Sequence, residues 1–180
     1  MTTYLALLRG INVGGKNLIG MPALKACFEA GGFDQVRTYI QSGNVIFSAP
    51  ATTPRALAER IESMLADAFD YEPTVVVRSD RQMRAVVQGA PKGFGARPSE
   101  YRSDVIFLKE PLTAREALEH VPTNPDVDEV ATGTGVLYFS RLASRATASR
   151  LNRIVGSPIY PRLTIRNWNT TTKLLALMTR

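Results

Sequence analysis

Apolar runs alternate with polar turns along the first half of the chain in a way that predicts six elements in the order βαββαβ. The runs expected to be strands lie at residues 4–8, 36–40, 45–47 and 74–77. Helices are expected after Pro22 and after Thr53-Pro54, where apolar side chains recur at three- and four-residue spacing. The glycine-containing segment 41–44 joins the second and third strands as a hairpin. This order favours an antiparallel sheet with both helices on one face.

The second half repeats the same order more loosely. Its predicted strands lie at residues 105–108, 127–131, 136–139 and 163–165. Its predicted helices cover residues 113–118, residues 146–155 and a last helix capped by Asn169 or Thr170. We therefore predict an α+β protein of two ferredoxin-like (α/β-plait, βαββαβ) subdomains, at residues 1–78 and 103–180, with the last helix added to the second. A helix that Asp80 can cap and a loop rich in Gly and Pro connect them over residues 79–102.

The strand order of a ferredoxin-like sheet, 4-1-3-2, brings two polar segments of the first half together. The first and second strands end at the same edge, so the loop 10–20 and the turn 41–44 should lie side by side. Backbone amides of such a loop can face an anion, and a lysine adds a positive charge. The glycines and asparagines can instead serve only to form a tight loop with positive φ. The candidate ligand-binding residues of this edge are Arg9, Asn12, Gly14, Gly15, Lys16, Asn17, Gln41, Ser42 and Asn44.

Residues 10–16 also match the G-x-x-x-x-G-K spacing of a P-loop. Two physical requirements of that motif are missing. Asn17 stands where a Ser or Thr hydroxyl would hold magnesium, and the helix is expected to begin near Pro22 instead of at Lys16. The sequence therefore disfavours nucleotide hydrolysis at this loop.

The net charge is +6, and the whole excess lies in the second half. Residues 1–78 carry seven basic and seven acidic side chains, whereas residues 79–180 carry fifteen and nine. Such asymmetry can attract polyanions or phosphorylated ligands, or can form a solvated basic face with no partner. Residues 141–180 contain no Asp or Glu, and their basic residues are Arg141, Arg145, Arg150, Arg153, Arg162, Arg166, Lys173 and Arg180.

Residues 166–173 combine the only tryptophan of the chain with two of these basic residues. Trp168 could stack against a base or a sugar while Arg166 and Lys173 hold phosphate. In the alternative, Trp168 packs the last helix on the sheet, and the nearby Asn and Thr side chains cap that helix.

Composition limits the remaining chemistry. With one histidine and one cysteine, a zinc site of the usual kind cannot be built, and we expect no metal and no cofactor. Cys27 lies on the apolar face of its helix and His120 near the end of a short helix, so no catalytic residue is assigned. The chain has no long apolar run, no basic leader and no pair of cysteines, which indicates a cytoplasmic protein without a membrane partner.

Three segments carry a resemblance to a known family. They are residues 6–17 (ALLRGINVGGKN), residues 38–45 (TYIQSGNV) and residues 166–174, with RNWNT followed by KL. Through them the chain resembles a bacterial family of uncharacterised proteins, domain-of-unknown-function family 1697. The resemblance implies a pair of ferredoxin-like subdomains and brings no activity, cofactor or catalytic residue. Residues 81–163 depart from the motifs of that family.

Three functions stay open on the sequence. The first is a binding module for a phosphorylated or anionic small molecule or a nucleic acid, using the loop 10–20 and the basic C-terminal region. The second is an enzyme acting on a small anionic substrate between the two halves, with Lys16, Arg9 and Ser42 as polar contacts. The third is a protein–protein interaction or assembly module. The oligomeric state is left open.

Overall fold

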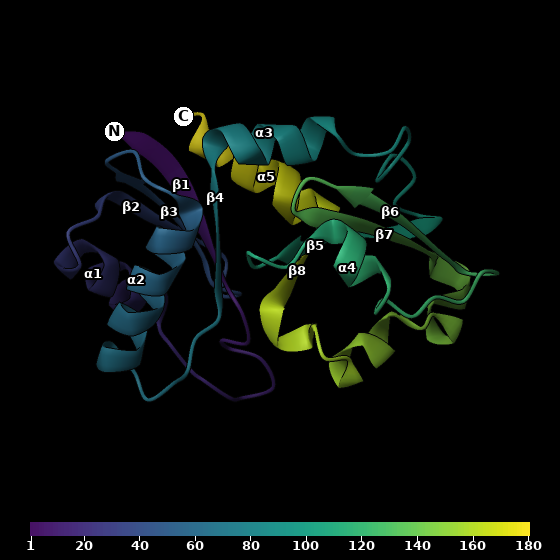
Figure 1. Ribbon diagram of the computed structural model, residues 1–180, viewed down its shortest axis with the longest axis horizontal. Helices are drawn as coiled ribbons and strands as arrows, with labels where there is room; N and C mark the ends of the chain where they lie inside the picture. The colour runs from purple at the N-terminus through teal and green to yellow at the C-terminus, as the bar shows by residue number, and fades with distance from the viewer. The chain divides into compact units, whose positions relative to one another are not determined.

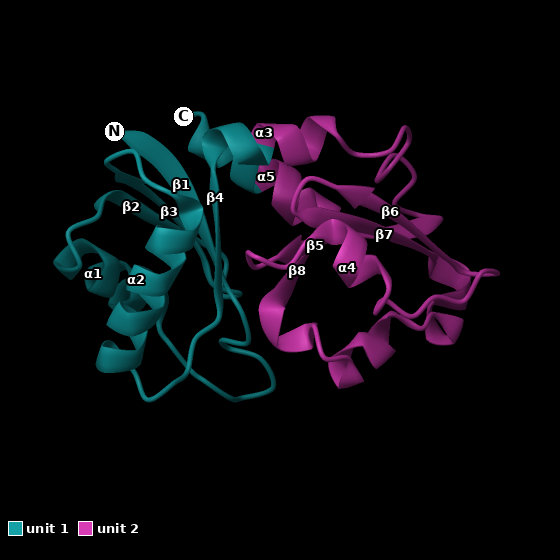
Figure 2. Cartoon of the chain, in the orientation of Figure 1, with its two compact units in different colours: residues 1–83, 174–180 teal, residues 84–173 magenta.

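The computed structural model describes residues 1–180, a mixed α/β protein with two four-stranded antiparallel sheets (Figure 1). The chain divides into two compact units (Figure 2): residues 1–83 with 174–180 form the first, and residues 84–173 form the second. In the first unit Arg37 Nη2 donates a hydrogen bond of 2.9 Å to the carbonyl of Leu177, so the C-terminal segment is attached to the β2 strand. From the order of elements, that segment was expected to belong to the second half. No helix is both long and apolar enough to cross a membrane.

The first unit has the strands and helices that its apolar pattern predicts. Neighbouring strands are antiparallel and lie in the order β2-β3-β1-β4, the order used above to place the two polar segments. Pro22 stands in the first turn of the first helix, and Thr53 caps the second by accepting a hydrogen bond from the Ala56 N–H. The elements are β1 (Thr2–Leu8), α1 (Met21–Ala30), β2 (Asp34–Tyr39), β3 (Asn44–Ala49), α2 (Pro54–Ala68) and β4 (Val75–Ser79).

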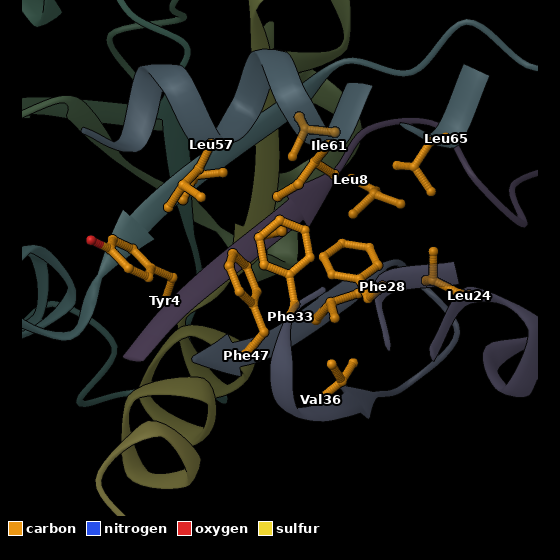
Figure 3. Packing of buried hydrophobic residues seen from close by; sticks show 14 of the residues in the cluster. Tyr4, Leu8, Leu24, Phe28, Phe33, Val36, Phe47, Leu57, Ile61 and Leu65 are labelled. Carbon is orange, nitrogen blue, oxygen red and sulfur yellow. The ribbon is translucent and has the colours of Figure 1, made fainter. Parts of the chain in front are cut away.

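Both helices of the first unit cover one face of its sheet. Side chains alternate along a strand, so Tyr4 and Leu8 of β1 point to the same face, where they meet apolar residues of α1 and α2 (Figure 3). Phe47 of β3 lies at the centre of this core, with its ring 4.7 Å from that of Phe33 and 5.6 Å from that of Phe28 between centroids. Leu57, Ile61 and Leu65 of α2 form the apolar helix face that packs against this core.

The second unit repeats the sheet order with different helices. Its strands lie in the order β6-β7-β5-β8, again antiparallel. Thr113, the first residue of the predicted helix 113–118, caps the α4 helix, and Glu116 completes a capping box by accepting from the Thr113 N–H. The elements are α3 (Asp80–Gln88), which begins in the first unit, β5 (Tyr101–Leu108), α4 (Ala114–Leu118), β6 (Asp128–Gly133), β7 (Val136–Leu142), the 3₁₀ helices η1 (Ala143–Ala148), η2 (Leu151–Gly156) and η3 (Tyr160–Arg162), β8 (Leu163–Asn167) and α5 (Trp168–Met178), which ends in the first unit.

The prediction of one helix over residues 146–155 is wrong. Two 3₁₀ helices flank a break at Ser149-Arg150, and Val155 is exposed instead of buried. The break has a cause outside the segment, because Asp128 Oδ2 accepts the Arg150 N–H at 2.9 Å. An N–H committed to a carboxylate of β6 is not available to a helical carbonyl.

Two helix caps also differ from the prediction. Asn167 Oδ1 accepts the Thr170 N–H at 2.8 Å, so Asn167 caps α5 and Trp168 is its first residue. At the start of α3, Ser79 Oγ accepts the Gln82 N–H while Gln82 Oε1 accepts the Ser79 N–H. Ser79, and not Asp80, is therefore the cap of this helix.

The two sheets carry matching backbone contacts where their central strands end. The Leu8 N–H donates to the Gly43 carbonyl at 2.8 Å, and the Leu108 N–H donates to the Gly135 carbonyl at 3.0 Å. Each glycine directly precedes the next strand, β3 or β7, and both have positive φ. The repeat seen in the order of elements therefore extends to individual hydrogen bonds.

Candidate functional site

Residues 10–20, which we call the glycine loop, form a small hairpin after β1. The Lys16 N–H donates to the Val13 carbonyl at 3.1 Å, and Gly14 and Gly15 between them have φ values of 58° and 75°. Two consecutive positive φ values are what a two-residue type I′ turn requires, and glycine adopts them without a steric penalty. Residues 13–18 are all exposed, so the Lys16 side chain lies in solvent beside the tip of the hairpin.

Asn12 holds the glycine loop against the β2–β3 turn, residues 40–43. Its Nδ2 donates 2.9 Å hydrogen bonds to the carbonyls of Ile19 and Gln41, and its Oδ1 accepts the Ile19 N–H at 2.9 Å. Asn12 has a φ of 53°, which asparagine tolerates better than most residues. The predicted proximity of loop and turn is confirmed, and the part these residues play in binding stays a prediction.

Further contacts fix the base of the loop. Asn17 Nδ2 donates to the Gly10 carbonyl at 3.0 Å, and the Arg9 N–H donates to the Thr74 carbonyl at 2.9 Å. The Tyr71 hydroxyl donates to the Arg9 carbonyl at 2.6 Å. Sequence reasoning did not include Tyr71 and Thr74 in this edge. The signal that could have found them is the antiparallel pairing of β4 with β1, which brings the segment before β4 to the place where β1 ends.

The β2–β3 turn contributes side chains of two kinds. Asn44 is fully buried, and its Nδ2 donates to the Tyr39 carbonyl at 2.9 Å and to Ser42 Oγ at 3.0 Å. Gln41, by contrast, is exposed, and Ser42 is half-buried. Asn44 therefore stabilises the turn from within, while Gln41 faces solvent at the same edge as Lys16.

The geometry of the glycine loop differs from that of a P-loop. The Lys16 N–H is already bonded to the Val13 carbonyl, and α1 begins at Met21. A P-loop phosphate needs free backbone N–H groups and a helix N-terminus at the lysine. Anion binding at this edge would rest on side chains, with Lys16 as the charged group.

The C-terminal candidates Arg166, Trp168 and Lys173 lie in the second unit. Arg166 is buried on β8, where its Nη1 donates to Thr164 Oγ1 at 2.8 Å and to the Ile165 carbonyl at 2.9 Å. Lys173 is exposed on α5. The structure therefore does not present Arg166 and Lys173 as a pair of exposed cations beside the tryptophan.

Trp168 is half-buried and packs within the second unit. Its ring meets that of Phe94 edge to face, with 5.1 Å between centroids. Gly95 lies so close that a Cβ added there would be 2.0 Å from Trp168 Cδ1. This contact, which the sequence did not predict, agrees with the alternative in which Trp168 is a packing residue.

Most of the basic residues between 141 and 180 are exposed, with Arg141 and Arg166 as the exceptions. Those at positions 145, 153 and 162 lie on the three 3₁₀ helices, and Arg150 lies between two of them.

Cys27 is half-buried on α1, and burial raises the pKa of its thiol above the usual value. A raised pKa leaves less thiolate, in agreement with the prediction of an unreactive side chain. His120 is exposed.

A family model described as "protein of unknown function (DUF1697)" matches residues 1–138. The chain belongs to this family, and the resemblance inferred from the sequence is confirmed. The segment 166–174 lies beyond the matched residues. The structure is similar to that of the conserved bacterial protein SP0830 from Streptococcus pneumoniae, with a TM-score of 0.84 and 24% sequence identity over 98% of each chain. That likeness concerns the fold alone. No curated protein matches the sequence.

Proposed function

We propose that this protein is a binding module for a phosphorylated or otherwise anionic ligand, with the glycine loop and the β2–β3 turn as its binding edge. The observation that carries the proposal is the hydrogen bond from Asn12 to Gln41, which joins the two segments into one surface. Lys16 and Gln41 are both exposed on it. Loops held by a rigid scaffold often carry function, because binding residues need fixed positions at the surface.

The chemistry of this edge suits an oxyanion. A lysine ammonium is a compact charge with three donors, and the Gln41 side chain adds an amide donor. Hydrogen bonds to a charged phosphate or carboxylate are roughly twice as strong as neutral ones. A nucleic acid is one such ligand, and the exposed arginines on the 3₁₀ helices of the second unit support a polyanion.

We also propose that residues 1–78 and residues 103–180 are two copies of a ferredoxin-like subdomain connected by residues 79–102, with the last residues of the second copy, 174–180, belonging to the first compact unit. The strand orders β2-β3-β1-β4 and β6-β7-β5-β8 support this assignment. The matching hydrogen bonds at Leu8 and Leu108 support a repeat.

Lys16→Ala tests the binding edge, with Lys25→Ala as a control that removes an exposed lysine of α1. Two probes distinguish the sources of phosphate: fluorescence anisotropy of a short labelled single-stranded DNA, and a thermal-shift titration with inorganic pyrophosphate. If DNA binds, the affinity falls steeply with salt, and Lys16→Ala lowers the salt slope by about one. Pyrophosphate alone shifting the melting curve identifies a small-molecule site. Unchanged affinity of Lys16→Ala for both probes contradicts the proposal, as does absence of binding by both.

A second candidate function, association with another protein, is favoured by apolar exposure at the same edge. Val13 is 64% exposed, Leu18 75% and Ile40 48%. Exposed apolar groups close together mark interaction surfaces more often than isolated ones do. Light scattering after size exclusion tests this function: association at high concentration that Leu18→Ser abolishes supports it, and a monomer at every concentration removes self-association.

A further inference from the structure

Strand β6 is an outer strand of the second sheet, and the backbone groups of alternate residues in it point away from that sheet. The Leu142 N–H donates to the Val127 carbonyl at 3.0 Å, so every second pair counted from Val127 exchanges hydrogen bonds with β7. Val130 and Thr132 stand in the pairs between, so their N–H and C=O groups point outward. No other part of the chain bonds these groups, which we call the free edge of β6.

The other outer strands are protected. On β4, Glu62 Oε1 accepts the outward N–H of Val75 at 2.8 Å. On β8, Arg166 Nη1 donates to the outward carbonyl of Ile165 at 2.9 Å, and β2 carries a register shift that interrupts its ladder. Such devices are common because unpaired backbone groups invite pairing with another strand. Strand β6 pairs regularly along its whole length and has no such contact beyond its first residue.

A pocket of about 370 Å³ adjoins the same strand. Glu129, Val130 and Ala131 of β6 line one side of it, and residues 91–97 line another. The Val130 side chain packs against the core on the opposite face of the sheet, so it is the Val130 backbone that borders the pocket. The free edge and the pocket therefore meet at one place.

The pocket has aromatic walls whose positions are fixed. The Tyr138 hydroxyl donates to the Val86 carbonyl at 2.6 Å, and Phe94 meets the Tyr138 ring edge to face with 5.4 Å between centroids. Tyr101 supplies a further ring. Ala131 pairs with Tyr138 in the register, and its methyl group is too small to fill the space beside that ring. Fixed rings around an open space suit one bulky apolar side chain.

The charge beside the free edge is negative. Glu129 lies on the face of β6 that carries the pocket, and it is exposed without an ion pair. Arg97, on the loop across the pocket, is already engaged by Glu100 at 3.0 Å. In a strand added at the free edge, residues two positions apart point to the same face. A residue opposite Ala131 would thus enter the pocket, and one two positions along would lie opposite Glu129.

We propose that the free edge of β6 binds an extended segment of another protein, which joins the sheet as an additional strand. Its aromatic side chain lies opposite Ala131 in the pocket, and a basic side chain lies opposite Glu129. Backbone hydrogen bonds to Val130 and Thr132 hold the segment, and the pocket selects its side chain. A second copy of β6 would offer the pocket only Ala131 and Gly133 and would add another Glu129, so it lacks this chemistry. The site lies in the second unit and does not depend on the function proposed for the glycine loop.

A phage-displayed library of random heptapeptides, selected on the immobilised protein, is the first probe. We expect the selected sequences to share an aromatic residue and a Lys or Arg two positions from it. The selected peptide is then synthesised with a fluorescent label, and its affinity is measured by anisotropy. Failure to enrich any sequence overturns the proposal, as does enrichment without this pattern.

Thr132→Pro removes one outward N–H of the free edge. Because that N–H takes no part in the ladder with β7, the sheet should stay folded, which circular dichroism checks. The labelled peptide should bind about tenfold more weakly, since one of its carbonyl groups loses its donor. Thr132→Val keeps the N–H and is the matched control, with unchanged affinity. Equal affinity of the proline and valine variants overturns the proposal.

Glu129→Lys keeps the test decisive if the proline variant does not fold. Glu129 is exposed and unpaired, so its replacement should leave the unfolding midpoint unchanged. The peptide with the basic residue should bind this variant about threefold more weakly, and a peptide with Glu at that position should bind it about threefold more tightly. Affinities that do not depend on the pairing of charges overturn the proposal.

Backbone amide exchange followed by NMR reports on strand addition itself. The amides of Val130 and Thr132 should exchange rapidly in the free protein and slowly with saturating peptide, while the amide of Ala131 is protected in both states. Exchange that the peptide does not change overturns the proposal. So does a dimer, detected by light scattering, that Thr132→Pro dissociates, because the edge would then bind a second copy. Lys16→Ala should leave peptide binding unchanged, so the two proposals can fail separately.

Discussion

The side-chain amide of Asn12 donates a hydrogen bond of 2.9 Å to the backbone carbonyl of Gln41, a residue 29 positions further along the chain. The same amide also donates to the Ile19 carbonyl. One side chain therefore closes the glycine loop on itself and attaches it to the neighbouring turn. Because the contact depends on a donor, a residue of the same shape without that donor isolates its contribution.

Asn12→Asp should destabilise the first unit by about 1–2 kcal/mol, since aspartate keeps the acceptor for the Ile19 N–H and loses both donated hydrogen bonds. Aspartate also tolerates positive φ, so backbone strain is not the cause. Urea unfolding followed by circular dichroism measures the change. Asn17→Asp, which loses only the bond to Gly10, is the control and should cost less. Equal losses in the two variants would show that the link to Gln41 contributes nothing.

Gly43→Ala should be more damaging than Gly10→Ala, although both glycines have positive φ. A Cβ at Gly43 would lie 2.7 Å from Ile11 Cδ1 and 2.8 Å from Leu8 Cβ, whereas nothing lies within 4 Å of one at Gly10. Backbone strain alone costs about 1–2 kcal/mol, and the overlap adds roughly 1–3 kcal/mol at Gly43. Thermal unfolding of both variants measures the difference. Similar midpoints would mean that the turn is not held against the end of β1.

Gly95→Ala should displace the ring of Trp168, because the added methyl group would overlap its Cδ1. Gly93→Ala is a matched control with a similar positive φ and open space around the added methyl. We expect the emission maximum of Trp168 to move to longer wavelength and acrylamide quenching to increase in Gly95→Ala alone. Both variants should lose about 1–2 kcal/mol from backbone strain. Identical spectra in the two variants would contradict the contact between Gly95 and Trp168.

Asp128→Ala should destabilise the second unit by about 2–4 kcal/mol, because it leaves the N–H groups of Asn124 and Arg150 without their acceptor. Asp126→Ala changes an exposed acid two residues before Asp128 and should alter stability by less than about 0.5 kcal/mol. Urea unfolding near neutral pH measures both.

The effect of Asp128 should also depend on pH. Burial alone would raise the pKa of its carboxyl, but hydrogen bonds from Ser149, Arg150 and Asn124 and the charge of Arg141 together lower it. A lowered pKa in the folded state gives stability that is complete above the ordinary value of 3.8 and is lost as the pH falls through the folded value. The difference between wild type and Asp128→Ala should therefore shrink below pH 3.8. A difference that stays constant into acid would show that the ionised carboxylate is not the stabilising form.

Turns and helix starts could be predicted from the sequence, because they depend on residues that are neighbours in the chain. The Gly-containing hairpin turns, the start of α2 at Thr53-Pro54 and the start of α1 near Pro22 follow from residues adjacent in the chain. The segment 146–155 has helical spacing, yet it breaks because Asp128, in a strand of another part of the chain, accepts the Arg150 N–H. Interactions between distant segments are not visible in a short window of sequence.

The candidate residues differ in the same way. The edge formed by the glycine loop could be predicted, because strand order alone brings the ends of β1 and β2 together. The packing of Trp168 could not, since it depends on the loop that carries Gly95 folding onto the ring.

The attachment of Leu177 to Arg37 has a consequence for the order in which the protein can be assembled. Residues 174–180 leave the ribosome after every residue of the second unit, although they belong to the first. The first unit therefore begins to be synthesised before the second and is completed after it. Its last residues, 174–180, become available only when all residues of the second unit have been synthesised and can fold.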